Sequence, residues 1–257
     1  MKITVLTLFP EMFTGVLENS IIRRAIAAGV VEIKLVNIRD YTTDKYGRVD
    51  SAPVGGGAGL IMKCQPIIDA LKANTISDSK VFMLSPKGET YSQSYAHKIK
   101  DEIKDLVLLC GHYEGIDERV NEYVDGFISI GDYILTGGEI GAMTIIDSVV
   151  RLLDGAIANE STEEESFEDG CLEYPQFTEP YEFNGKKIPD VLYSGNHEAI
   201  KKWRRKESLR ITREKRPDLF EKLELSKQDK KLLKEIDDNT IGDWETNAIE
   251  KGKKFIK

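Results

Sequence analysis

Residues Ser129-Ile-Gly-Asp-Tyr-Ile-Leu-Thr-Gly-Gly-Glu139 say more about this 257-residue chain than any other stretch of it. An apolar run ends at Gly131, a second bend follows at Gly137-Gly138, and a helical pattern then begins. Glycine allows the backbone to take a positive φ or to approach a neighbour closely. We therefore expect a strand, a glycine-rich loop and a helix, with main-chain groups of the loop free to hold a flat ligand.

Strand-like and helical patterns alternate on both sides of this stretch. Alternation of this kind predicts an α/β fold with a parallel sheet. The expected strands cover residues 3–9, 31–38, 80–84, 106–110 and 126–130. The expected helices cover residues 11–28, 66–73, 92–104, 116–124 and 139–154.

The composition changes sharply after residue 160. Residues 160–182 hold nine acids and no Lys or Arg, whereas residues 186–216 hold 11 Lys or Arg against 4 acids. An acidic run of this kind is typical of a linker, and the pattern beyond residue 196 is helical. We predict an α/β ligand-binding domain over residues 1–160, a flexible acidic linker over 161–176 and a small helical domain over 177–257.

The whole chain has a formal net charge of −8 and is 40% hydrophobic. This charge argues against a uniform nucleic-acid coat but leaves room for a local basic patch. Three widely spaced cysteines (Cys64, Cys110 and Cys171) support neither a disulfide framework nor a zinc ribbon. No apolar run approaches the ~18 residues of a membrane span. A cytoplasmic protein with no membrane contact is expected.

Three predicted strands run into loops of unusual composition, at residues 84–89, 111–115 and 131–138. In open α/β sheets, ligands bind beyond the carboxyl ends of the strands, so these loops predict one shared pocket, although each taken alone fits an ordinary βα turn. Neither a P-loop nor a Rossmann glycine pattern is present. Residues 55–59 fit a flexible loop better than a phosphate cradle, and an enzyme that acts on nucleotide phosphates remains one alternative.

Several motifs occur together and in a fixed order: Leu84-Ser-Pro86, Cys110-Gly-His-Tyr-Glu-Gly-Ile-Asp-Glu-Arg119, the 129–139 stretch, Ser166-Phe-Glu-Asp-Gly170 and Ser194-Gly-Asn-His-Glu-Ala-Ile200. With these motifs, residues 1 to about 220 resemble the bacterial tRNA (guanine-N1-)-methyltransferases of the SPOUT superfamily. The resemblance implies S-adenosylmethionine-dependent methylation of the guanosine immediately 3′ of the anticodon in tRNA. It also implies a trefoil knot in the sheet domain and a homodimer whose active site is shared between subunits.

The resemblance places the methyl donor on the three loops already identified. Adenine is flat and uncharged, so main-chain groups and apolar side chains can bind it. The implied cofactor-binding residues are Leu84, Ser85, Pro86, Gly111, Tyr113, Glu114, Ile130, Gly131, Asp132, Tyr133, Ile134, Leu135, Gly137 and Gly138. The precise role of Asp132 stays open, since it could also cap the following turn, and His112 fits a packing residue of its loop better than an acid or a base.

Methylation of the guanine N1 atom sets its own requirements. That nitrogen carries a proton, so a general base must remove it, and a cationic donor must stabilise the charge that develops on the guanine oxygen. By resemblance Asp169 is the base and Arg151 the donor. The competing interpretations are that Asp169 is one more charge of an acidic linker and that Arg151 extends from an apolar helix to the solvent.

The basic segment is the expected tRNA surface, because cations there would contact phosphates. The predicted RNA-binding residues are His197, Lys201, Lys202, Arg204, Arg205 and Arg210. A cation-rich helix can also be only a solvated face, and a non-catalytic RNA-binding protein is the second functional hypothesis. The resemblance further implies a need for Mg²⁺, although no carboxylate cluster in the sequence predicts a protein site for it.

The chain departs from the family pattern in two places. Phe177 and Glu179 stand where the family commonly has Tyr and Arg, which puts one tRNA contact or loop anchor in doubt. Ser51 and Val54 stand where it usually has Asp and Tyr, which weakens the expected part of the first glycine-rich loop in binding. Neither departure touches the implied base or the cofactor loops.

Overall fold

The computed structural model describes residues 1–157 and 164–252. Contacts within the chain divide it into two compact units, Met1–Asn159 and Glu160–Lys257. The domain boundary predicted between residues 160 and 161 lies outside the described residues.

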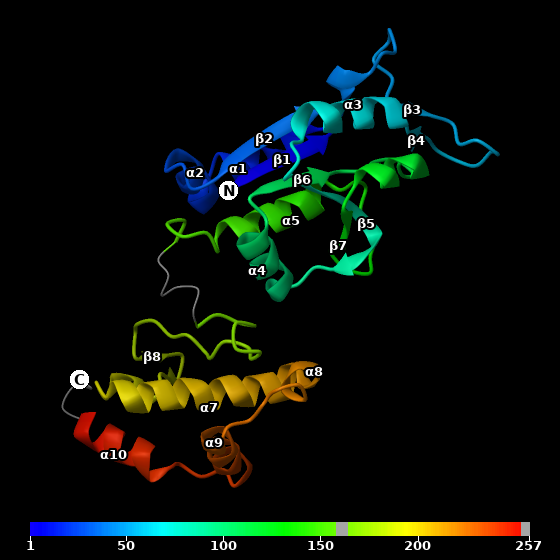
Figure 1. The fold of residues 1–257 in the computed structure, drawn as a ribbon. Coiled ribbons are helices and arrows are strands. Elements are labelled where there is room, and N and C mark those ends of the chain that lie inside the picture. The colour runs from blue at the N-terminus through cyan, green and yellow to red at the C-terminus, as the bar shows by residue number, and fades with distance from the viewer. Residues whose placement is uncertain (158–163, 253–257) are drawn as a thin grey trace. The chain divides into compact units, whose positions relative to one another are not determined.

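The first unit is built on a five-stranded sheet with the order β2-β1-β6-β5-β7, and every neighbouring pair in it is parallel (Figure 1). The predicted α/β class with a parallel central sheet is therefore confirmed. In chain order the strands are β1 (Lys2–Thr7), β2 (Glu32–Asn37), β5 (Lys80–Thr90), β6 (Asp105–Leu109) and β7 (Gly126–Ser129). A short antiparallel pair stands apart from the sheet, formed by β3 (Asp50–Ser51) and β4 (Ile61–Met62).

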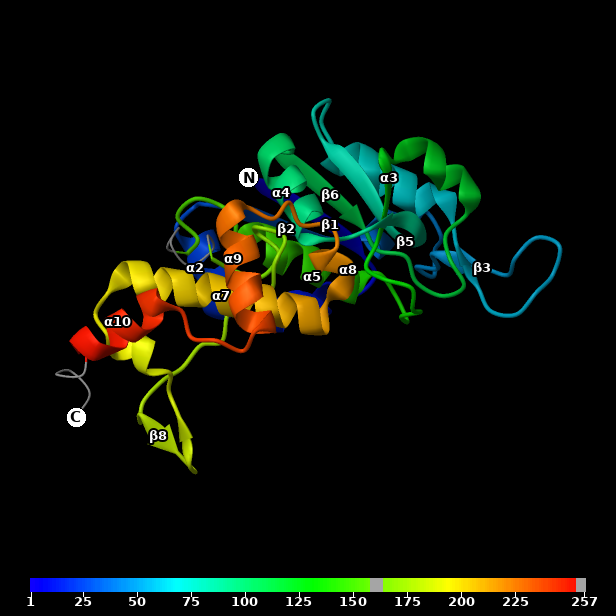
Figure 2. The ribbon, with the colours of Figure 1, turned by 90° about the horizontal axis from the view of Figure 1, so that it is seen from below.

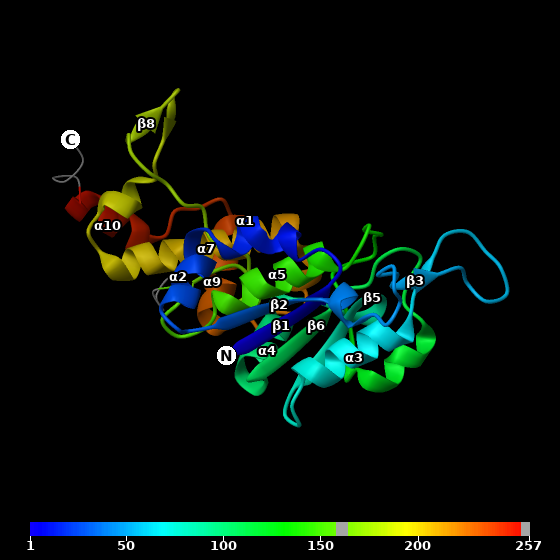
Figure 3. The same cartoon turned by 90° about the horizontal axis from the view of Figure 1, so that it is seen from above.

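Helices cover both faces of this sheet, which is why its central strand β6 is an uninterrupted buried segment. Side chains of α2, α4 and α5 join one apolar cluster, and side chains of α3 and η3 join the other. Figures 1 and 3 show α3 and α5 on opposite sides of the sheet. The helices of this unit are η1 (Pro10–Phe13), α1 (Thr14–Leu17), α2 (Ser20–Ala27), η2 (Ile38–Tyr41), α3 (Cys64–Asn74), α4 (Gln93–Glu102), η3 (Glu118–Tyr123) and α5 (Glu139–Val150).

Several predicted boundaries need correction. Three short helices, η1, α1 and α2, replace the single helix expected over residues 11–28, and the extended residue Asn19 separates α1 from α2. The helix expected over 116–124 is a 3-10 helix. Strand β5 does not end at Leu84: both Leu84 and Glu89 lie opposite Ile128, so residues 85–88 leave the strand as a bulge before it resumes.

The second unit contains the helices α7 (His197–Lys215), α8 (Pro217–Phe220), α9 (Lys227–Asp237) and α10 (Asp243–Gly252), as Figure 2 shows. Leu209 of α7 packs with Leu232 and Leu233 of α9, and Trp203 packs with Ala248 of α10. A small hairpin, β8 (Glu182–Phe183) and β9 (Lys186–Lys187), and η4 (Asp190–Tyr193) precede α7. Among the described helices, none has the length and apolarity needed to cross a membrane.

The buried central strand gives a stability prediction. Leu108 of β6 is fully buried in the cluster that α5 covers. Leu108→Ala removes packed methyl groups and leaves a cavity, so the free energy of unfolding should fall by about 2–5 kcal/mol. Urea denaturation followed by circular dichroism measures this. Val54→Ala, at a fully exposed loop residue, should change it by less than ~0.5 kcal/mol, and equal effects of the two would contradict the packing described.

Candidate active site

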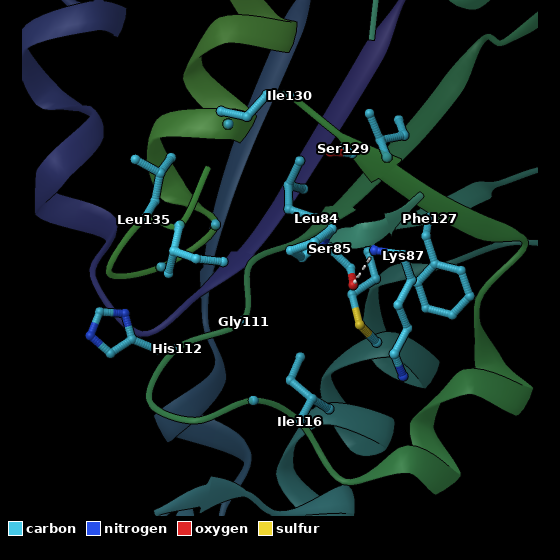
Figure 4. A pocket seen from close by; sticks show the side chains of 18 of the residues that line it. Leu84, Ser85, Lys87, Gly111, His112, Ile116, Phe127, Ser129, Ile130 and Leu135 are labelled. Carbon is cyan, nitrogen blue, oxygen red and sulfur yellow. Dashed lines mark hydrogen bonds between the residues drawn. The ribbon is translucent and has the colours of Figure 1, made fainter. Parts of the chain in front are cut away.

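A cavity of about 490 Å³ lies beside the bulge of β5, beyond the carboxyl end of β6 and around the carboxyl end of β7. Figure 4 shows side chains of β5 and β7 and of the segments after β6 and β7 around it. Every residue predicted to bind the cofactor lines this cavity except Asp132, which is exposed and is not among the lining residues. Sequence reasoning missed the other lining residues, namely Met83, Lys87, His112, Gly115, Ile116, Glu118, Asn121, Phe127, Ile128, Ser129, Thr136 and Gly141.

The first wall of the cavity is the bulge of β5. Gly88 lies so close to the backbone of β7 that a Cβ atom there would be 2.4 Å from the carbonyl carbon of Phe127. The amide of Lys87 donates to the Ser85 hydroxyl at 3.3 Å, the bond drawn in Figure 4. The side chain of Lys87 reaches Glu118 at 2.8 Å, so the charge of this lysine is balanced at the rim.

The other two loops meet backbone to backbone. Gly138 donates its amide proton to the carbonyl oxygen of Gly111 at 2.8 Å. A Cβ atom on Gly138 would lie 2.8 Å from the Cα of Cys110 and 3.1 Å from the Cβ of Leu84. Only Gly131 of the three glycines in the 129–139 stretch has a positive φ, of 141°. Gly137 instead leaves room for His112 and Glu139, and Gly138 lets the start of α5 approach Cys110 and Leu84.

A buried carboxylate lies behind these loops. Glu139 is 2% exposed and accepts a hydrogen bond from the Thr7 hydroxyl at 2.8 Å. The His112 Nδ1 atom is 3.8 Å from Glu139 Oε2, too far for a hydrogen bond, and the ring packs against Phe9 with centroids 4.8 Å apart. Burial raises the pKa of the Cys110 thiol well above its usual value, and Glu139 adds to the effect. Cys110 is therefore a neutral packing residue and no nucleophile.

The Gly55–Gly59 loop does not line the cavity, but it supports one residue that does. The amide of Glu114 donates to the carbonyl oxygen of Leu60 at 3.0 Å. A Cβ atom on Gly59 would lie 2.3 Å from Glu114 Cγ. Glycine at position 59 thus lets the loop lie against Glu114, which is a packing role and not that of a phosphate cradle.

Neither of the two residues expected to act on the guanine belongs to the lining of this cavity. Arg151 directly follows α5, whose first turn borders the cavity; the 12 residues of that helix place Arg151 about 18 Å further along its axis. Asp169 belongs to the second unit, where its Oδ1 atom accepts from the Cys171 amide at 3.0 Å and its Oδ2 atom from Arg205. Neither residue is among those that line the cavity.

The predicted RNA-binding residues all belong to α7, but much of their charge is locally balanced. His197 and Lys201 are exposed. Arg204 pairs with Glu164 at 3.0 Å, and Lys202 lies over the ring of Trp244 at 5.2 Å. Arg205 contacts Asp229 at 2.8 Å. Arg210 contacts Glu207 at 2.6 Å and Glu214 at 3.1 Å. The sequence count alone overstated how basic this helix is.

Metal-binding geometry was sought over residues 1–157 and 164–252. No group of three or more His, Cys, Asp or Glu side chains in these ranges is placed to hold a metal ion. The described structure therefore offers no protein cage for the Mg²⁺ that the resemblance implies.

Comparison with known proteins gives one consistent result. A family profile described as "tRNA (Guanine-1)-methyltransferase TrmD" matches residues 1–222. A protein of Clostridium perfringens (strain SM101 / Type A) named tRNA (guanine-N(1)-)-methyltransferase is 54% identical over 236 residues, which are 91% of this chain and 99% of that protein. A protein of the same name from Clostridium botulinum (strain Hall) is 53% identical over 238 residues, 92% of this chain and 98% of its own length. This chain belongs to the tRNA (guanine-1)-methyltransferase family.

Proposed function

We infer that this chain transfers a methyl group from S-adenosylmethionine to the N1 atom of a guanosine in tRNA, the one immediately 3′ of the anticodon. The observation that carries this function is the cavity between the bulge of β5 and the segments at the carboxyl ends of β6 and β7, in a chain of this family. The volume of about 490 Å³ falls in the usual range for small-molecule sites.

The lining of the cavity fits this methyl donor. Glycine backbone and apolar side chains make up most of it, which suits a flat, uncharged adenine. Lys87 is the single lysine or arginine among the described lining residues, and Glu118 balances it, so a phosphate would find no cation to bind. Glu114 supplies a carboxylate of the sign that a sulfonium prefers. When bound, S-adenosylmethionine supplies an electrophilic methyl group.

Asp169 is proposed as the general base that removes the guanine N1 proton, and Arg151 as the donor to the guanine oxygen. The distance of Arg151 from the cavity along α5 supports its acting at the cavity of a second subunit, together with Asp169. Large apolar side chains beside the cavity support such a homodimer, because Tyr133, Ile134 and Ile140 are 55%, 85% and 48% exposed.

Membership of the family supports four further properties of this chain. They are the trefoil knot of the sheet unit, cytoplasmic action, a tRNA surface along α7 and a Mg²⁺ requirement met through the RNA or the acidic linker. The exposed residues His197 and Lys201 support an RNA contact near the start of α7. Arg204, Arg205 and Arg210 each pair with a carboxylate of the second unit. Phosphates of the tRNA would have to displace these carboxylates before the three arginines could bind RNA.

Asp169→Asn tests the base. The amide cannot accept the N1 proton as a carboxylate does, so methyl transfer should fall by about 10²–10⁴-fold. Transfer is measured with labelled S-adenosylmethionine and a tRNA bearing guanosine 3′ of its anticodon, and cofactor affinity by calorimetry should stay unchanged. Normal transfer by the variant would remove Asp169 from the mechanism. No transfer by the native protein, with RNA binding intact, would favour the non-catalytic RNA-binding hypothesis.

Gly138→Ala tests the cavity. The added methyl group meets backbone at 2.8 Å and cannot be accommodated without separating the loops of β6 and α5. We expect at least a tenfold weaker affinity for S-adenosylmethionine by calorimetric titration. Gly15→Ala, at a glycine of α1 with open space around it and no positive φ, is the control and should bind normally. Binding of ATP in place of S-adenosylmethionine by the native protein would instead favour an enzyme of nucleotide phosphates.

A further inference from the structure

The turn that carries Asp169 is attached to α7 at several points. Its own bonds close it, since the amide of Phe167 donates to the carbonyl oxygen of Cys171 at 2.7 Å. The amide of Leu172 then donates to the Thr212 hydroxyl of α7 at 2.8 Å, and the Ser208 hydroxyl donates to the carbonyl oxygen of Leu172. Cys171 is 1% exposed and packs with Leu209 of the same helix. Asp169 therefore sits on a turn that is fastened to α7 from residue 171 onward.

The carboxylate itself is held by Arg205, one helical turn before Ser208 and Leu209. Arg205 donates through Nη1 to Asp169 Oδ2, and the same nitrogen lies 3.4 Å from the Cys171 sulfur. The other side of the guanidinium faces α9, where Nε and Nη2 donate to the two oxygens of Asp229 at 2.8 and 3.2 Å. A bidentate pair of this kind fixes the plane of the guanidinium.

Asp229 is in turn fixed by the start of α9. It is 5% exposed and forms a capping box with Ser226, with both bonds at 3.0 Å. Burial by itself would raise the pKa of Asp229, but the bonds from Arg205 and Ser226 outweigh it and hold the pKa below the usual value. The side-chain bond to Asp229 is also the main reason that the pKa of Arg205 is raised. Both partners thus stay charged at neutral pH.

We propose that Arg205 is a positioning residue for Asp169, fixed by Asp229, and that α7 carries the catalytic carboxylate on a rigid platform. This inference rests on the proposed function, since it assumes that Asp169 is the base. The sequence predicted a flexible linker over residues 161–176, a range that contains Asp169. The contacts with Arg205, Ser208 and Thr212 instead make the base move together with the helical unit.

The hydrogen bonds from Arg205 and Cys171 leave the Asp169 carboxylate able to accept a proton. An ionised carboxylate has about four lone-pair directions on its two oxygens, and Asp169 uses one for the Cys171 amide and one for Arg205. Its side chain is 59% exposed, so the remaining directions face outward. The contacts with α7 fix the orientation of the Asp169 carboxylate. Such orientation matters because a misplacement of a catalytic group by about 1 Å can lower the reaction rate by about 10²-fold.

Arg205→Met tests the positioning role in the full-length protein. The change keeps most of the side-chain length and removes the bonds to both aspartates. We expect kcat for tRNA methylation to fall by about 10- to 100-fold, with unchanged KM for tRNA and unchanged calorimetric affinity for S-adenosylmethionine. Arg213→Met is the matched control, because Arg213 also joins α7 to α9, through Asp237 at 2.8 Å, without contacting Asp169. It should keep the native kcat.

Two readouts separate positioning from a general loss of structure. Hydrogen exchange in the cofactor-free protein should be faster over residues 166–173 in Arg205→Met than in Arg213→Met, because the Asp169 side chain loses its anchor. Millimolar guanidinium should restore part of the lost kcat in Arg205→Met and have no effect on Arg213→Met. Asp229→Asn, which keeps the shape of the cap but weakens the hold on Arg205, should show a smaller fall in kcat.

Four results would contradict the positioning role of Arg205 or the role of Asp169 as the base. An unchanged kcat in Arg205→Met, with Asp169→Asn inactive, would overturn the positioning role and leave the proposed function standing. A raised kcat would also overturn it, since Arg205 would then restrain the base. A raised KM for tRNA at native kcat would identify Arg205 as an RNA contact instead. Full activity of Asp169→Asn would refute the proposed base itself.

Discussion

The candidate site depends on one close contact between backbones. Gly138, at the start of α5, bonds to Gly111, just beyond β6, and approaches Cys110 and Leu84 more closely than any side chain would allow. This contact joins the loops that follow β6 and β7 beside the bulge of β5, and it gives the cavity a fixed shape. A second glycine, Gly88, does the same between the bulge of β5 and β7. At both positions the absence of a side chain on glycine allows two backbone segments around the cavity to come this close.

The two units divide the chemistry that the family requires. The sheet unit has a cavity whose lining is mostly backbone and apolar, which suits holding a methyl donor. The acid–base candidate Asp169 lies in the other unit, on a turn attached to α7, where Arg205 links it to Asp229. A reaction that must place a methyl donor behind a nitrogen and remove the proton of that nitrogen needs both parts to meet on the substrate.

The number of Lys and Arg residues in α7 overstates the positive charge that this helix exposes to the solvent. The sequence between residues 186 and 216 is strongly basic, yet Arg205 and Arg210 face carboxylates of their own unit. Lys206 is 8% exposed and pairs with Glu235 at 3.1 Å. These partners come from α9 or from neighbouring turns of α7, so only the folded unit reveals which cations still face the solvent.

The sequence by itself determined the parallel α/β class, because apolar strand runs alternate with helical patterns, and it determined which strand ends carry the unusual loops. The motifs, which are local in the chain, named 13 of the 25 residues that line the cavity, and they also named Asp132, which does not line it. The sequence did not reveal the bulge that carries β5 on to Thr90, the part of Glu118 and Asn121 in the lining, or the hold of Arg205 on Asp169. Each of these depends on partners far away in the chain, such as Ile128 for the bulge or Asp229 for Arg205. The local sequence pattern indicates periodicity and turn types. Contacts between residues that are far apart in the sequence form only when the chain folds.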